Sequence, residues 1–258
     1  MPYITLPVVD LTAEPKKASA DFSHDDLRLT QLLYGEELKI EKCEGDWLYI
    51  SAVEQNGYLG WIPKSAVNQK DREIASHVVC ALTTTLDNTL ISYATYLTED
   101  EAKRVNPQTI RPIPKAFDPH LLVKDAHLFI GAPYLWGGRS APLPGKAASV
   151  DCSGFINLLY RAQGQLIPRD AHDQSIAAID APLLKGSVIY LRKKERNNHV
   201  VIYLSENTCI ESPETGRCVQ ISSLNWDNDK VHIENREGAY FSVKMFARRE
   251  RNLSNALV

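Results

Sequence analysis

The centre of the sequence carries the stretch 150–160 (VDCSGFINLLY), in which a single cysteine stands at the start of a predicted helix. Asp151 is a favourable N-cap residue, and Cys152 then falls in the first turn, where free backbone N–H groups and the helix dipole favour an anion. A thiolate is such an anion, so this position makes the sulfur nucleophilic. Phe155, Ile156 and Leu159 continue at helical spacing and give the helix a buried face. The alternative, an inert buried cysteine, is disfavoured because suitable partners follow downstream.

Those partners are a histidine and a carboxylate on two predicted strands. The stretch 197–204 (NNHVVIYL) reads as a turn and then a short β-branched strand, with His199 where the chain enters the strand. An imidazole can take the thiol proton and later protonate a leaving amine. A second strand carries Glu211, and a hairpin of this length puts both side chains on one face, opposite or diagonal. Glu211 can then hold the second nitrogen of His199. Cys152, His199 and Glu211 are therefore predicted to be catalytic, and His172 is the alternative third residue.

These residues resemble the NlpC cysteine peptidases of bacterial cell walls. The resemblance covers roughly residues 116–250 and rests on five motifs in the family's order: 133–138 (PYLWGG), 151–154 (DCSG), 167–171 (IPRDA), His199 at its strand, and 210–212 (IES). It implies an α+β fold, with a papain-like catalytic domain at residues 116–258. Many members carry histidine, asparagine or glutamine where this chain has Glu211. An acidic residue also occurs there, so the difference is expected to change the pH profile more than the mechanism.

Several further residues are predicted to contact substrate. A cysteine–histidine pair attacks an acyl carbon and forms a thioester that water resolves, and the oxyanion needs hydrogen-bond donors. The backbone N–H of Cys152 is one candidate and Tyr134 is a second, with an aromatic packed under its loop as the alternative. Ser153 either helps to cap the helix or contacts substrate. Arg169 pairs with a substrate carboxylate or, more commonly for such a residue, forms a surface ion pair with Asp170 or Asp173. The predicted substrate-binding set is Tyr58, Tyr134, Trp136, Asp151, Ser153 and Arg169.

Composition narrows the class of protein. The 258 residues carry a net charge of −3, which provides no basic footprint for nucleic acid. No stretch approaches the length of a transmembrane helix, so no membrane partner is expected. The five cysteines are scattered without paired spacing, so neither a metal site nor a disulfide framework is predicted, and no cofactor is implied. The segment 1–7 (MPYITLP) does not read as a signal peptide, which predicts the bacterial cytoplasm. A periplasmic or secreted location applies if a leader precedes this sequence.

The first 70 residues predict a separate all-β module. Short apolar runs punctuated by Gly, Asp and Asn turns are typical of a small antiparallel barrel. Their order resembles a bacterial SH3-like domain, best over residues 45–63. Residues 71–115 are read as a possible shortened second SH3-like domain, ending in an extended linker at 111–114. Asp118 and Pro119 then open a helix that Gly131 ends. The segment 139–149, rich in Ala, Pro and Gly, is expected to gate access to Cys152.

The resemblance also implies a substrate. NlpC enzymes of this architecture cleave the bond between γ-D-glutamate and the diamino acid of peptidoglycan stem peptides, usually meso-diaminopimelate. The SH3-like domain closes one end of the groove and reads a free N-terminal L-Ala amine; Tyr58 is the matching tyrosine, and Asp25 or Asp26 is the acid. This implies a murein-recycling endopeptidase. An amidase or acyltransferase on the same core, or a non-catalytic wall-binding protein, are the alternatives. The oligomeric state is left open.

Overall fold

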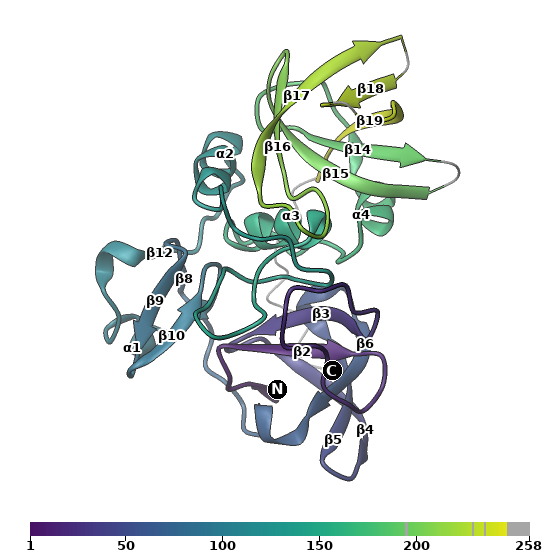
Figure 1. The fold of residues 1–258 in the computed structure, drawn as a ribbon. Coiled ribbons are helices and arrows are strands. Elements are labelled where there is room, and N and C mark those ends of the chain that lie inside the picture. The colour runs from purple at the N-terminus through teal and green to yellow at the C-terminus, as the bar shows by residue number, and fades with distance from the viewer. Residues whose placement is uncertain (194–195, 229, 235, 247–258) are drawn as a thin grey trace.

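The computed structural model describes residues 1–193, 196–228, 230–234 and 236–246, and its chain forms three packed parts (Figure 1). The last residues of the predicted catalytic domain, 247–258, lie outside the described part. The first part is a small β-barrel with strand order β3-β2-β6-β5-β4 and a separate β1–β7 pair. Its elements are β1 Tyr3–Ile4, β2 Val8–Thr12, β3 Arg28–Leu33, β4 Leu38–Glu44, β5 Trp47–Ala52, η1 Val53–Gln55, β6 Tyr58–Pro63, η2 Lys64–Ala66 and β7 Val67–Asn68. Alternate residues such as Leu48, Ile50 and Ala52 point inward and form its own apolar core.

The second part is a small β module with a core of its own. Its elements are β8 His77–Val79, β9 Thr83–Leu86, β10 Thr89–Ser92, β11 Tyr96–Leu97, α1 Glu99–Ala102, η3 Pro107–Thr109 and β12 Ile110–Pro112. β8 lies between β11 and β12, and β9 pairs with β10. Val79, Leu86, Ile91 and Leu97 pack together in this module. The predicted linker at 111–114 is therefore wrong in part, because its first two residues belong to a strand bonded to β8.

The third part combines three helices with a seven-stranded antiparallel sheet, which confirms the predicted α+β class behind an all-β barrel. Its elements are α2 Pro119–His127, α3 Cys152–Arg161, α4 Ala171–Ala177, β13 Ile179–Asp180, β14 Val188–Lys193, β15 Arg196–Ser205, β16 Thr208–Glu211, β17 Gln220–Asp227, β18 Lys230–Ile233 and β19 Ala239–Met245. The strand order is β13-β19-β14-β15-β16-β17-β18, and β18 also pairs with β19, so the sheet closes on itself. α2 starts at the predicted Asp118 N-cap but ends at His127, before Gly131.

The two faces of this sheet bury different sets of side chains. Tyr190 and Val200 belong to the large core that also contains Phe155 and Leu159 of α3. Their neighbours Ile189 and Val201 point the other way, into the interior of the closed sheet. The alternation follows from the two-residue period of a strand, and each fully buried side chain stabilises the fold by about 1.5–3 kcal/mol. The nucleophile helix is thus fixed along its whole apolar face.

Charged side chains join the barrel to the third part. Arg139 is fully buried and donates to Glu36 Oε1 of the barrel (2.6 Å) and to Asn157 Oδ1 of α3 (2.5 Å). Arg161, also buried, pairs with Glu54 of the barrel at 2.8 Å. A buried ion pair requires close geometry to offset the cost of desolvation, so these contacts fix the orientation of the barrel relative to α3.

The segment 139–149 takes part in the same interface. Gln31 of the barrel donates to Ala147 O (2.7 Å), and Ala141 N donates to Ser92 Oγ of the second part (2.8 Å). No residue of 139–149 lines the cleft that contains Cys152 within the described structure. The prediction that this segment gates the cleft is therefore wrong: its polar backbone groups are bound to the other two parts.

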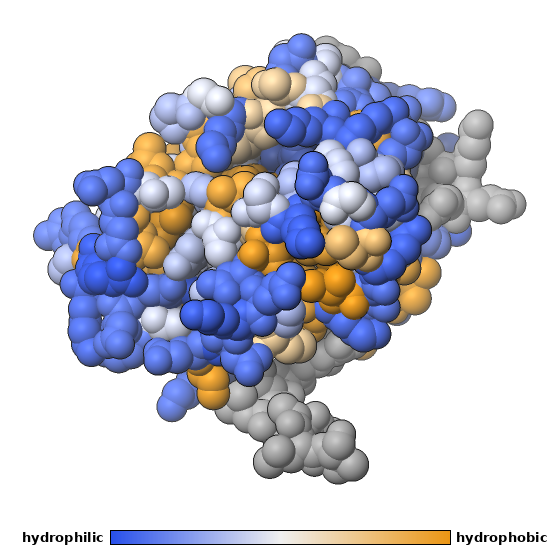
Figure 2. Space-filling model, turned by 90° about the horizontal axis from the view of Figure 1, so that it is seen from below, coloured by the Kyte–Doolittle hydropathy of each residue, from blue (hydrophilic) through white to orange (hydrophobic). Residues whose placement is uncertain are grey.

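The surface seen from below, where the barrel lies, is mainly hydrophilic with scattered hydrophobic areas (Figure 2). Within the described residues, no helix has the length and apolar character needed to cross a membrane.

Candidate active site

Cys152 is the first residue of α3, at the position predicted from the sequence. Asp151 is the N-cap, and its Oδ1 accepts from the backbone N–H of Gly154 at 2.6 Å. A side chain at Gly154 would collide with the carbonyl oxygen of Gly138, so glycine is required for this turn to pack against the preceding loop. Gly137 has a φ of +70°, and a Cβ there would lie 2.6 Å from the Arg28 carbonyl of the barrel. Both glycines let the loop, the barrel and the nucleophile helix approach closely.

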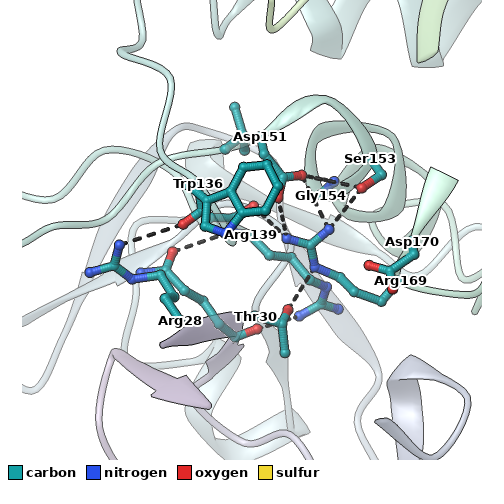
Figure 3. A network of polar contacts seen from close by, with 12 residues as sticks. Arg28, Thr30, Trp136, Arg139, Asp151, Ser153, Gly154, Arg169 and Asp170 are labelled. Carbon is teal, nitrogen blue, oxygen red and sulfur yellow. Dashed lines mark hydrogen bonds and ion pairs between the residues drawn. The ribbon is translucent and has the colours of Figure 1, made fainter. Parts of the chain in front are cut away.

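Arg169 holds the carboxylate that caps this helix (Figure 3). Its Nη2 donates to Asp151 Oδ2 at 2.6 Å and its Nη1 to Asp151 Oδ1 at 3.1 Å. Nη1 also donates to Ser153 Oγ (2.9 Å), and Nε donates to Thr30 Oγ1 of the barrel (2.7 Å). Figure 3 shows the guanidinium lying between Asp151 and Ser153 on one side and Thr30 on the other. Arg169 therefore connects the barrel to the start of α3.

These contacts correct the prediction for Arg169 and define the partners of Asp151 and Ser153. Arg169 is 2% exposed and is absent from the cleft wall, so it neither faces substrate nor forms a surface pair with Asp170 or Asp173. Asp151 lines the cleft, and its carboxylate binds the Gly154 N–H and Arg169, so it positions the helix. Ser153 also lines the cleft, and its hydroxyl is bonded within this cluster; contact of either residue with substrate stays a prediction.

His199 and Glu211 meet as the hairpin predicted. The register pairs Ile202 with Ile210, which places Glu211 diagonally from His199 on the same face. His199 Nε2 lies 2.6 Å from Glu211 Oε2. The other ring nitrogen, Nδ1, is then the one that is available to Cys152. The strand starts at Arg196 and not at His199, so the histidine is held by sheet on both sides of it in the chain.

The charges of this group favour an imidazolium. Burial of the His199 ring opposes its charge, but the hydrogen bonds and charges of Cys152 and Glu211 are stronger and raise its pKa to about 9. Burial likewise opposes the charge of Glu211, but hydrogen bonds from His199, Ser222 and Arg236 lower its pKa to about 2. At neutral pH His199 is therefore protonated and Glu211 is ionised, and a positive charge beside a cysteine favours its nucleophilic thiolate form.

Glu211 is fully buried, and within the described structure its carboxylate contacts the side chains of His199, Ser222 and Arg236, each of which can donate a hydrogen bond. Its Oε2 faces His199, while Oε1 accepts from Ser222 Oγ at 2.7 Å and from the Arg236 guanidinium. A buried carboxylate needs this many donors to stay ionised. Glu211 can therefore fix the orientation of the His199 ring and stabilise its charge.

A cleft of about 410 Å³ opens over Cys152 and His199. Cys152 and His199 lie in its wall together with the predicted Tyr58, Tyr134 and Trp136. Tyr134 is 6% exposed, and burial together with the charges of Asp151 and Cys152 raises its pKa above the usual range. Its hydroxyl thus stays protonated and can donate to an oxyanion. Trp136 is 39% exposed, and its ring lies 4.2 Å from the ring of His24.

The barrel supplies one wall of this cleft. Tyr58 from β6 donates to Asp170 Oδ2 at 3.0 Å, and Asp26 lines the same wall. Asp25 does not: its two oxygens accept from the backbone N–H groups of Ser19 and Leu27. His172, the alternative third catalytic residue, also lines the cleft, but the partner of His199 is Glu211.

Sequence reasoning missed several residues of the site: Asp170, Asn198, Pro213, Ser222 and Arg236. Asp170 lies inside the motif 167–171, so the sequence resemblance could have identified it. Ser222 and Arg236 are ordinary polar residues far along the chain from Cys152, and only the closure of the sheet brings them to Glu211.

Two family models match the chain: the NlpC/P60 family over residues 131–241 and the bacterial dipeptidyl-peptidase SH3 domain over residues 21–67. Gamma-D-glutamyl-L-lysine dipeptidyl-peptidase from Bacillus cereus is 27% identical, covering 81% of this chain and 74% of the relative. The protein of the same name from Bacillus subtilis is 24% identical, covering 78% and 77%. A murein DD-endopeptidase from Escherichia coli is 38% identical over 40% of this chain and 39% of its own length.

Solved structures share the fold. A crystal structure of an NlpC/P60 family protein from Bacillus cereus has a TM-score of 0.73 and 23% identity, covering 93% of this chain and 99% of that one. An NlpC/P60 endopeptidase from Photobacterium damselae subsp. piscicida has a TM-score of 0.59 and 13% identity, covering 94% and 65%. At these sequence identities, the structural similarity shows a shared fold and nothing further. The first match extends through all three parts of the chain.

Proposed function

This chain is a cysteine peptidase of the NlpC/P60 family, and we propose that it hydrolyses the γ-D-glutamyl–meso-diaminopimelate bond of peptidoglycan stem peptides with a free N-terminal L-Ala. One observation carries the proposal: the cleft over Cys152 and His199 has Tyr58 and Asp26 of the barrel in its wall. A wall built from another domain limits the length of peptide that fits on that side. The relatives named gamma-D-glutamyl-L-lysine dipeptidyl-peptidase support the type of bond.

The barrel side of the cleft has the groups that a free amine needs. An ammonium donates hydrogen bonds and is stabilised by carboxylates. Asp26 is exposed in this wall, and Asp170 stands beside Tyr58 at hydrogen-bond distance. We assign Asp26, not Asp25, as the acid that reads the N-terminal amine, because the Asp25 oxygens are bound to backbone donors. An N-acetylmuramoyl group would replace the ammonium with a neutral amide, and the sugar would collide with this wall.

The chemistry follows from the arrangement of the catalytic residues. The Cys152 thiolate attacks the γ-carbonyl carbon of D-glutamate, and the backbone N–H of Cys152 and the Tyr134 hydroxyl donate to the oxyanion. His199 then gives its proton to the departing α-amine of the diamino acid. Water attacks the thioester with His199 as the base, which releases L-Ala-D-Glu and restores the thiolate. Glu211 keeps the ring oriented in both steps.

Mass spectrometry of the products tests the proposal. The enzyme is incubated with L-Ala-γ-D-Glu-meso-diaminopimelate and, separately, with the same tripeptide linked to N-acetylmuramic acid. Release of L-Ala-D-Glu from the free tripeptide alone is the expected result, and Cys152→Ala is the inactive control. Cleavage of both substrates would contradict the amine-reading wall, and release of the intact tripeptide from the muramoyl form would identify an amidase instead.

A free N-terminal L-Ala exists only after the stem peptide has left its sugar. We therefore propose murein-peptide recycling in the bacterial cytoplasm as the setting of this reaction. Cell fractionation of the native organism with an antibody to this chain tests the location. Recovery in the periplasm or medium would contradict it.

A further inference from the structure

A second cavity of about 200 Å³ adjoins the catalytic cleft. It shares Asn198, His199 and Pro213 with the wall of the cleft, so the two spaces meet at the catalytic histidine. We call it the histidine-side cavity. The barrel wall with Tyr58 and Asp26 belongs to the cleft and not to this cavity. The histidine-side cavity therefore extends the site in a different direction from the amine-reading wall.

The chemistry decides which part of the substrate lies on this side. His199 protonates the leaving amine, so the residue that carries this amine must bind next to His199. The proposed leaving group is a diamino acid, and its long side chain needs space beside the imidazole. The histidine-side cavity is the space that the structure provides there. This inference rests on the proposed function.

The walls of the cavity match a methylene chain with a charged end. Leu191, Val231, Ile233 and Ala239 supply apolar surface, Arg236 supplies a positive charge, and Glu214 and Glu237 supply negative charges. The distal end of meso-diaminopimelate carries both an ammonium and a carboxylate. Lysine ends in an ammonium alone, which gives Arg236 no carboxylate to bind. A cavity with one cation and two acidic neighbours therefore suits the zwitterionic end better than the lysine end.

Arg236 has donors left for a ligand. Its Nε donates to the carbonyl oxygen of Ile233 (3.2 Å) and its Nη2 donates to Glu211. These bonds use two of the five N–H donors of a guanidinium. The side chain keeps 29% of its surface exposed. We propose that Arg236 binds the distal carboxylate of the diamino acid and thereby makes the enzyme selective for meso-diaminopimelate over lysine.

Three tripeptides test this assignment: L-Ala-γ-D-Glu-meso-diaminopimelate, the same peptide amidated at the distal carboxylate, and L-Ala-γ-D-Glu-L-Lys. We expect kcat/KM for the first to exceed that for the other two by about tenfold in the wild type, the effect of one charge-assisted hydrogen bond. In Arg236→Met the ratio should fall to near one. All rates fall in this variant because Glu211 loses a partner, but that loss is common to the three substrates and cancels in the ratio.

Arg217→Met is the matched control. Arg217 pairs with Glu234 at 2.8 Å in the neighbouring polar network and does not line the cavity. Its removal takes away the same charge nearby and should leave the tenfold ratio unchanged. An unchanged ratio in Arg236→Met, or an equal loss in Arg217→Met, would overturn the assignment.

If turnover of Arg236→Met is too slow to measure, binding affinities replace rates in the test. Calorimetry with Cys152→Ala, and with Cys152→Ala combined with Arg236→Met, gives Kd for the acid and amidated peptides. The tenfold ratio should be present in the first protein and lost in the second; the same ratio in both would overturn the assignment. A wild-type enzyme that releases no L-Ala-D-Glu from any of the three peptides overturns the proposed function instead.

Discussion

An arginine–carboxylate pair stabilises each of the two catalytic side chains, and the two pairs differ in their exposure. Asp151 caps the helix of Cys152 and is held by Arg169, whose side chain is 1% exposed and reaches into the barrel. Glu211 holds His199 and is held by Arg236, whose side chain is 29% exposed and lines a cavity. Arg169 of the buried pair does not line the cleft, so this pair positions the helix of Cys152. The half-buried pair serves the histidine and remains available to a ligand.

The largest expected effect on stability is that of Arg169→Met. Removing this arginine leaves Asp151 buried without its counter-charge, so we expect the free energy of unfolding to fall by about 3–5 kcal/mol. Arg217→Met, which breaks a pair with side chains 33% and 29% exposed, should cost less than about 1 kcal/mol. Urea unfolding followed by circular dichroism measures both. If Arg169→Met and Arg236→Met lower the free energy of unfolding equally, the difference in burial between the two pairs does not affect stability.

Glu211→Gln should act on the rate. The amide keeps the shape but loses the charge and can present N–H to the His199 ring, so we expect kcat/KM to fall by about 100-fold. The pKa of His199 is raised partly by Glu211, and the alkaline limb of the pH–rate profile should therefore move to lower pH. Steady-state kinetics from pH 5 to 10 measure both effects. A wild-type profile in this variant would exclude Glu211 as the third catalytic residue and leave His172 to be tested.

The pair at the histidine should also make stability depend on pH. His199 has a folded-state pKa of about 9 against 6.5 for the free group, so its contribution is complete below pH 6.5 and is lost as the pH rises through 9. Glu211 has a pKa of about 2 against 4.5, so its contribution is present above pH 4.5 and is lost as the pH falls toward 2. Unfolding midpoints at pH 6 and pH 10, for the wild type and His199→Gln, measure the first effect.

The wild type should lose more stability between these two pH values than the variant. The pKa of Arg169 is raised further above its usual range because the charge of Asp151 outweighs burial, so that pair keeps its arginine charged throughout. An equal loss in the wild type and in His199→Gln would place the pH dependence elsewhere.

The smallest expected effect is that of Tyr58→Phe, which removes one hydrogen bond between the barrel and the third part. The bond to Asp170 should contribute about 1 kcal/mol to stability. KM for the free tripeptide should rise while kcat changes little, because Tyr58 lies in the wall that reads the amine and not beside the thiol. A fall in kcat at constant KM would contradict this placement.

The sequence alone is sufficient to locate the proposed catalytic residues. Cys152 was detectable because N-capping and helical periodicity are local properties of the chain. His199 and Glu211 were detectable because a hairpin of short loop has few registers, and each register fixes which side chains share a face. The barrel was detectable from its turns, and Tyr58 and Trp136 from the motifs that contain them.

The contacts that surround these residues depend on how distant segments of the chain pack together. Arg169 looks like a surface residue in the sequence, yet the packing of the barrel encloses it with Asp151 and Thr30. The segment 139–149 looks like a mobile loop, yet Gln31 of the barrel and Ser92 bind its backbone. Arg236 reaches Glu211 only because β18 and β19 close the sheet. Burial and charge pairing depend on contacts between distant segments, and no local pattern in the chain encodes such contacts.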